Sequence, residues 1–132
     1  GITINENYII TPRFISKSAT NGGYCMAKEL FNKYPEVTAI FAYNDAIAVG
    51  VCLAANEMGL KIPDDISLIG FDDIEIASLI NPKLTTVAQP LFDIGKSAAE
   101  LLLKRIKEEK RSITQTILLP TNLVIRDSVR RI

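Results

Sequence analysis

The sequence predicts an α/β fold built on a mostly parallel sheet, and two stretches of chain carry this prediction. A strand is expected at residues 37–42, where the apolar run 39–42 stops just before an Asn-Asp pair, residues 44–45, and a helical pattern begins. The apolar residues 66–71 form a second such strand, which ends at an Asp-Asp pair, residues 72–73. Strand, helix and strand within about 35 residues imply a right-handed crossover and parallel pairing. Both polar pairs must then lie at the same edge of the sheet, where ligands bind in open α/β folds.

Composition limits the possible functions. The 132 residues suffice for one modest domain, and 48% hydrophobic with 23% charged residues is ordinary for a soluble globular protein. The net charge is zero, which argues against nucleic-acid binding without another domain. The chain has no histidine and no glycine-rich phosphate loop, so we expect no enzyme, no metal site and no cofactor. No apolar stretch reaches the roughly 20 residues that cross a membrane, and no signal-peptide pattern opens the chain.

The first part of the chain predicts a strand, a helix and the first of the two buried strands. Residues 8–10 are a short β-rich run. Residues 16–23 are loop material in which Ser18 or Thr20 is available as a helix cap. A helix is expected from about residue 22 to residue 34, because its apolar positions fall on one face and proline follows.

The helix that follows the first polar pair is rich in small residues, which suits close packing on a sheet. Gly59 supplies its C-terminal stop. Cys25 and Cys52 each lie within an apolar helical pattern and are too far apart for a metal knuckle. Both are therefore expected to be small core residues.

The second half predicts a short helix, a third strand, a long helix and two final strands. Residues 74–80 are short and apolar on most sides, which suggests contact with a partner surface. A strand is expected at residues 84–87, a helix from residue 91 to about 109, and strands at residues 114–119 and 122–128. The long helix carries an apolar stripe made of Leu91, Ile94, Ala98, Leu102 and Ile106.

Four segments in fixed order resemble one protein family: AIFAYNDAIAVG, GLKIPDDISLIGFDD, NPKLTTVAQP and GKSAAELLLKRI. Over about residues 23–127 the chain is similar to the LacI/GalR family of bacterial transcription regulators. Members of that family have an N-terminal helix-turn-helix, a hinge helix, and an effector domain of two α/β lobes that resembles the type I periplasmic sugar-binding proteins. The resemblance implies a three-layer α/β/α arrangement for the C-terminal lobe, with a ligand cleft between the lobes.

The resemblance also implies a division of the chain. Residues 1–88 and 121–132 would belong to the C-terminal lobe, and residues 89–120 would pack on an N-terminal lobe. That lobe, the hinge and the helix-turn-helix are not expected within this sequence. The apolar stripe of the long helix would then be uncovered, so we expect a homodimer, either domain-swapped or back-to-back, or a mobile helix.

The family's effector contacts carry over to four positions of this sequence. The amide of Asn44 and the carboxylate of Asp72 match the residues that hydrogen-bond sugar hydroxyls, and together they suit a diol. Phe14 falls where many members place an aromatic ring against the ligand. Gln89 lies near the crossover between the lobes.

A structural alternative competes at the same strand ends, because Asn and Asp also cap helices well. From the residues alone, Asn44 or Asp45 could be a cap and nothing more. With the resemblance added, we expect Asp45 to cap the helix and Asn44 to bind the ligand. Asp73 is expected to be a turn or cap residue.

The resemblance implies that the chain is the effector-sensing part of a cytoplasmic transcriptional repressor. It would bind a sugar or sugar phosphate, and operator DNA through the helix-turn-helix of the intact protein. The ligand would shift the population between lobe arrangements that differ in DNA affinity. The alternative is an extracytoplasmic sugar-binding protein of an ABC transporter, although IPDDISLIGFDD and NPKLTTVAQP look more like the regulators.

Overall fold

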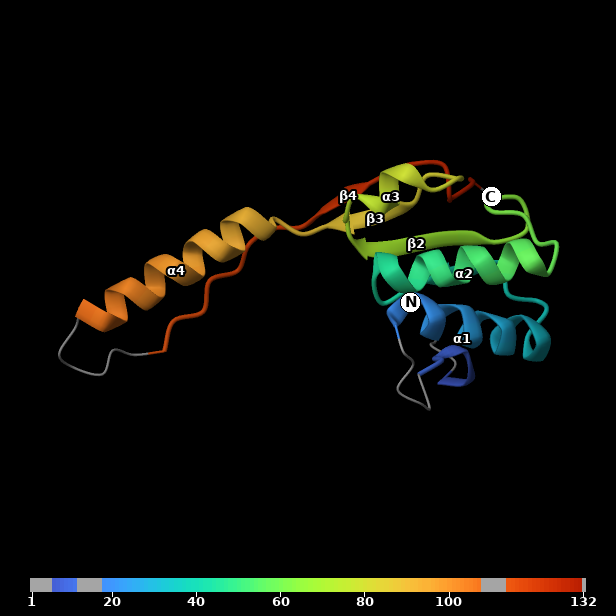
Figure 1. Cartoon of the computed structure of the whole chain (residues 1–132), viewed down its shortest axis with the longest axis horizontal. Coiled ribbons are helices and arrows are strands. Elements are labelled where there is room, and N and C mark those ends of the chain that lie inside the picture. Colours follow the sequence, from blue (N-terminus) through green and yellow to red (C-terminus); the bar gives the residue numbers. More distant parts are fainter. Residues whose placement is uncertain (1–5, 12–17, 108–113, 132) are drawn as a thin grey trace.

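The computed structural model describes residues 6–11, 18–107 and 114–131. Helices and strands alternate along these residues (Figure 1). In chain order the elements are η1 (Glu6–Tyr8), α1 (Ala19–Lys33), β1 (Ala39–Phe41), α2 (Asp45–Glu57), β2 (Ser67–Asp72), α3 (Ile76–Leu79), β3 (Thr85–Ala88), α4 (Leu91–Lys107) and β4 (Asn122–Val124).

The four strands form one sheet in the order β1-β2-β3-β4. β1 pairs in parallel with β2, and β2 in parallel with β3, while β4 runs antiparallel to β3. The carboxyl ends of β1, β2 and β3 therefore meet at one edge of the sheet. The predicted α/β class with a mostly parallel sheet is confirmed.

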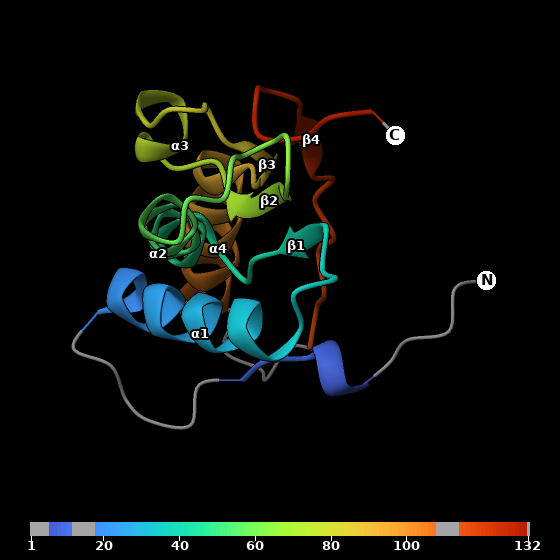
Figure 2. The same cartoon turned by 90° about the vertical axis from the view of Figure 1, so that its right-hand side faces the viewer.

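Helices α1, α2 and α3 lie on one side of this sheet, with α1 next to α2 (Figure 2). Leu68 of β2 is fully buried in the core on that side. Side chains alternate between the faces of a strand, so Phe41, which pairs with the next residue of β2, points the other way and is 65% exposed. The described residues place no helix on that second face. They contain two of the three layers that the resemblance implies.

Close contact between α1 and α2 depends on two glycines. A Cβ atom at Gly23 would lie 2.3 Å from the carbonyl oxygen of Ile47, and one at Gly50 would lie 2.1 Å from that of Thr20. Because packed interiors leave no spare room, a larger residue at either position would push the helices apart. Gly50, one of the small residues expected to suit close packing on a sheet, thus lies against α1.

The ends of these two helices follow the predicted signals. Ser18, one of the two expected caps, is the N-cap of α1, and its side chain accepts a hydrogen bond from the backbone N–H of Asn21 at 3.2 Å. Gly59 has a φ of +73° just past α2, the left-handed conformation that commonly ends a helix.

Two predicted strands are wrong and a third is shorter than expected. The run at residues 8–10 overlaps the 3-10 helix η1, and within residues 114–121 the structure has no strand. Of the expected strand at residues 122–128, only Asn122–Val124 pairs with β3. A β-branched sequence forms a strand only where another strand can pair with it, and residues 117–119 instead lie beside α4.

After β4, buried side-chain hydrogen bonds hold the chain to the sheet. The Oγ of Ser128, which is fully buried, accepts from the N–H of Thr85 at 2.8 Å and donates to the carbonyl of Leu68 at 2.6 Å. One hydroxyl thus links the final segment to both β2 and β3.

Helix α4 extends away from the rest of the molecule on two connecting segments (Figure 1). None of its described side chains is buried. Six large apolar side chains of α4 are exposed: Leu91 (57%), Phe92 (82%), Ile94 (40%), Leu102 (60%), Leu103 (57%) and Ile106 (71%). The predicted stripe is therefore present and uncovered. No helix in the described part of the chain is long and apolar enough to cross a membrane.

The two cysteines differ in exposure, and the prediction that both are core residues is wrong for Cys25. Cys25 is exposed because α1 buries a different face, formed by Gly23, Ala27, Leu30 and Phe31. Cys52 is half-buried, and burial raises the pKa of its thiol to about 11.

This difference predicts selective chemical labelling. Only the thiolate reacts with a disulfide reagent, so at pH 8 Cys25 should react within the mixing time while Cys52 stays unmodified in the folded protein. Mass spectrometry before and after unfolding in guanidinium checks this. Modification of both thiols at equal rates in the native protein would contradict it.

Candidate functional site

Three predicted ligand residues lie at the carboxyl ends of three neighbouring strands. Asn44 follows β1, Asp72 ends β2 and Gln89 follows β3. Asn44 and Asp72 each lie three residues beyond the paired residues Phe41 and Ile69. All three side chains are half-buried. Residues separated in sequence thus meet at one edge of the sheet.

Asn44, not Asp45, caps helix α2, which corrects the expectation for Asp45. The Oδ1 of Asn44 accepts a hydrogen bond from the N–H of Ile47 at 2.9 Å, the geometry of an N-cap. This bond uses one lone pair of the amide oxygen and neither hydrogen of the amide nitrogen. The cap therefore leaves Asn44 able to donate to a ligand.

Asp72 and Gln89 contact each other directly. The Nε2 of Gln89 donates to the Oδ1 of Asp72 at 2.5 Å. A carboxylate has about four acceptor positions, so Asp72 keeps capacity for hydroxyl donors. The contact joins the end of β2 to the connection that leads to α4.

Asp73 lies in the turn after β2, as predicted, and forms an ion pair. Its Oδ1 lies 2.7 Å from Nη2 of Arg126, and Nη1 of Arg126 donates to the carbonyl of Leu84 at 2.8 Å. Asp72 and Asp73 have φ angles of 106° and 56°, which non-glycine residues rarely adopt. The two acids thus hold the chain on either side of α4, Asp72 through Gln89 before it and Asp73 through Arg126 after it.

Asp45 is fully buried and hydrogen-bonded on both carboxylate oxygens. Its Oδ1 accepts from Oγ1 of Thr86 at 2.6 Å, and its Oδ2 accepts from the N–H of Ile74 at 2.9 Å. This role is not visible in the local sequence, because both partners of Asp45 are distant along the chain. One signal was available in the sequence. Two polar residues, Asn44 and Asp45, stand at the start of a helix that needs only one cap.

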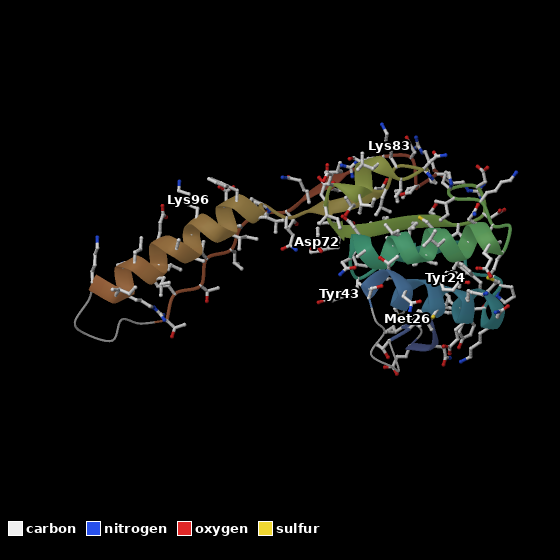
Figure 3. All side chains as sticks on the ribbon, in the orientation of Figure 1. Tyr24, Met26, Tyr43, Asp72, Lys83 and Lys96 are labelled. Atoms are coloured by element: carbon white, nitrogen blue, oxygen red, sulfur yellow. The ribbon has the colours of Figure 1, made fainter. Side chains whose placement is uncertain are left out.

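The aromatic contact predicted for the site is Phe14. Phe14 lies outside the described residues. Tyr43, which the sequence motifs did not single out, is 81% exposed, and it lies with Asp72 at the end of the molecule that faces α4 (Figure 3). An exposed aromatic ring beside polar groups can cover the apolar face of a small polar ligand.

A hollow of about 650 Å³ lies between η1, α1, β1 and α2. Tyr43 and Asn44 reach it, but Asp72 and Gln89 do not line it, and its walls are mainly apolar. It therefore adjoins the polar edge at Asn44 but does not extend to Asp72 and Gln89. The described residues contain no group of three or more Asp, Glu, Cys or His side chains that could hold a metal ion.

The polar edge offers one carboxylate and two amides, with an aromatic ring nearby. Such groups can accept from adjacent hydroxyls and donate to their oxygens, which is the chemistry of binding a neutral diol. The described site contains no histidine–nucleophile pair of the kind that acyl transfer uses.

Comparison with known proteins identifies the family. Residues 4–129 match the periplasmic binding protein-like domain. The chain is 37% identical over 131 residues to the HTH-type transcriptional repressor PurR of Vibrio vulnificus, covering 99% of this chain and 38% of that protein. It is 38% identical over 128 residues to the ribose operon repressor of Haemophilus influenzae, covering 97% of this chain and 37% of that protein. The chain thus spans less than two fifths of the length of these relatives.

A solved structure is similar as well. A LacI family transcriptional regulator from Enterococcus faecium, crystallised with bound ribose, superposes with a TM-score of 0.74 and 39% identity, over 83% of this chain and 40% of that one. The relatives named here are transcription regulators, not enzymes. The chain belongs to the periplasmic binding protein-like domain family, in the branch formed by the effector-binding domains of LacI-family transcription regulators.

Proposed function

We propose that this chain is the effector-sensing part of a LacI-family transcriptional repressor, and that its effector is a sugar or a sugar phosphate. One observation carries the proposal. A half-buried carboxylate, Asp72, and the amides of Asn44 and Gln89 converge at the carboxyl ends of three adjacent strands. The repressor of a ribose operon and a ribose-bound regulator among the relatives support a sugar as the ligand.

In the proposed complex Asp72 accepts hydrogen bonds from two neighbouring hydroxyls, and Asn44 donates its free amide hydrogens to a ring or hydroxyl oxygen. A hydroxyl that takes the same acceptor position of Oδ1 that Gln89 now uses would displace the Gln89 amide. Ligand binding would then break the Gln89–Asp72 hydrogen bond, which holds the connection between β3 and α4. A ligand shifts a conformational equilibrium only by binding one state better, and this exchange of partners provides such a difference.

The proposal includes the organisation of the intact protein. Residues 1–88 and 121–132 would form the C-terminal lobe, and residues 89–120 would pack on an N-terminal lobe across the ligand cleft. The uncovered side of α4 supports this division. The repressor would act in the cytoplasm as a homodimer and bind operator DNA through a helix-turn-helix outside this chain. The named relatives are regulators, which favours this function over a sugar-binding protein of an ABC transporter.

A thermal-shift screen on the full-length protein tests the proposal. The panel contains D-ribose, other pentoses and hexoses, and their phosphates, each at millimolar concentration. A ligand that binds only the folded state raises the melting temperature. A panel without a stabilising sugar or sugar phosphate would reject the proposed effector class.

Replacing Asn44 by serine separates its two roles. Serine caps a helix about as well as asparagine, so Asn44→Ser should keep the stability of α2 within about 0.5 kcal/mol. It cannot place an amide where the ligand binds, and affinity for the sugar found in the screen should fall about tenfold. Urea unfolding and isothermal titration calorimetry measure the two effects. Wild-type affinity in this variant would show that Asn44 is a cap alone.

A further inference from the structure

We infer that Asp45 is a positioning residue of the binding site, which fixes the Asp72 carboxylate without contacting the ligand. The inference rests on the proposed function, since it concerns the same site. Asp45 is the first residue of α2 and is fully buried, so its side chain is out of reach of any ligand at the sheet edge. Its two hydrogen bonds nevertheless reach the chain just after Asp72 and the strand that precedes Gln89.

The first bond acts on the turn that carries Asp72. The N–H of Ile74 donates to Asp45, and Ile74 is two residues beyond Asp72. Between them the chain takes two consecutive positive φ angles, at Asp72 and Asp73. Such conformations persist only where surrounding contacts impose them. Asp45 holds the backbone of this turn at Ile74. The ion pair with Arg126 holds the side chain of Asp73.

The second bond acts on β3. Thr86 is fully buried and donates its hydroxyl to Asp45. In the sheet, Thr86 pairs with Gly70, and two residues further along Ala88 pairs with Asp72. One carboxylate therefore sets the ends of β2 and β3 relative to the start of α2. Those are the elements that carry Asp72, Gln89 and Asn44.

Gly70 of β2 shows that the strand makes room for this carboxylate. A Cβ atom at Gly70 would lie 2.2 Å from the Oδ1 of Asp45 and 2.8 Å from a methyl carbon of Leu84. A strand interior ordinarily disfavours glycine, and here the missing side chain admits the carboxylate. The close approach of Asp45 to β2 thus depends on the carboxylate in α2 and on glycine at position 70 of β2.

Ser128 offers a matched control, because it links strands in the same sheet by two buried hydrogen bonds but holds neither Asp72 nor Ile74. Asp45→Ala removes the acceptor for both donors. Asp45→Asn keeps both contacts, since its carbonyl can accept from Ile74 while its amide donates to the hydroxyl of Thr86. The asparagine variant is therefore the conservative rescue.

The experiment uses the full-length protein and two measurements. Hydrogen exchange of the peptide spanning residues 70–76 reports on the turn without any ligand, and calorimetric titration with D-ribose reports on the site. Asp45→Ala should speed exchange of the Ile74 amide about tenfold and weaken ribose binding about tenfold. Asp45→Asn should restore both, and Ser128→Ala should lower overall stability with neither local effect.

Two results would overturn the inference. In the first, the Ile74 amide of Asp45→Ala exchanges as slowly as in the wild type. In the second, Ser128→Ala shows the same faster exchange and weaker ribose binding as Asp45→Ala. A wild-type protein that binds neither ribose nor any other sugar of the panel would reject the proposed function instead. The exchange measurement still decides whether Asp45 holds the turn, so the two failures are distinguishable.

Discussion

Replacing Asp72 in the full-length protein should abolish the response to effector while leaving operator binding intact. Asp72→Ala removes the carboxylate at the end of β2 that accepts from Gln89 and, in the proposed complex, from two sugar hydroxyls. Asp72→Asn is the sharper variant, because asparagine tolerates positive φ better than most residues and the φ here is 106°. Losing two charge-assisted hydrogen bonds should weaken binding about 100-fold.

Operator binding in the presence and absence of the sugar, measured by fluorescence anisotropy, checks this result. Asp64→Asn is the matched control, since it removes an exposed carboxylate that lies before β2, at the opposite end of that strand. It should respond like the wild type. Normal release or capture of operator by the Asp72 variants at wild-type sugar concentrations would refute the assignment of Asp72.

The strands that carry the site could be predicted because each is an apolar run that stops at polar residues. The strand–helix–strand order then required the two polar ends to share an edge, and the sheet confirms this. The roles of Asn44 and Asp45 could not be separated in the same way. Both residue types cap helices, and which one does so depends on where the first helical turn begins.

The function of Asp45 lies beyond local sequence reasoning because its partners are 29 and 41 residues away. The misassigned strands fail for a related reason. Residues 114–119 have the β-branched composition of a strand, but sheet formation needs a neighbouring strand with free backbone groups. The composition of residues 114–119 does favour a strand, but among the described residues no strand pairs with them.

The 132-residue chain on its own should self-associate through the apolar side of α4. Leu102 and Ile106 lie one turn apart, and both are more than half exposed. Gly95, where a Cβ atom would meet nothing within 4 Å, lies on the same side. Burying each large side chain would contribute about 1.5 to 3 kcal/mol, so several together suffice for a dimer at micromolar concentration. Sedimentation velocity over a concentration series measures the effect.

The double variant Leu102→Glu with Ile106→Glu should be monomeric, because two carboxylates on the apolar side oppose its burial. Glu100→Lys, which changes a charge on the polar side of the same helix, should still self-associate. In the full-length protein the same double variant should lower the melting temperature, since α4 would there be covered by the other lobe. A wild-type chain that stays monomeric with α4 helical would contradict the predicted dimer. It would also show that the apolar side of α4 is stable without a covering surface. The outcome therefore tests whether the stripe on α4 is an interface or an ordinary solvent-facing surface.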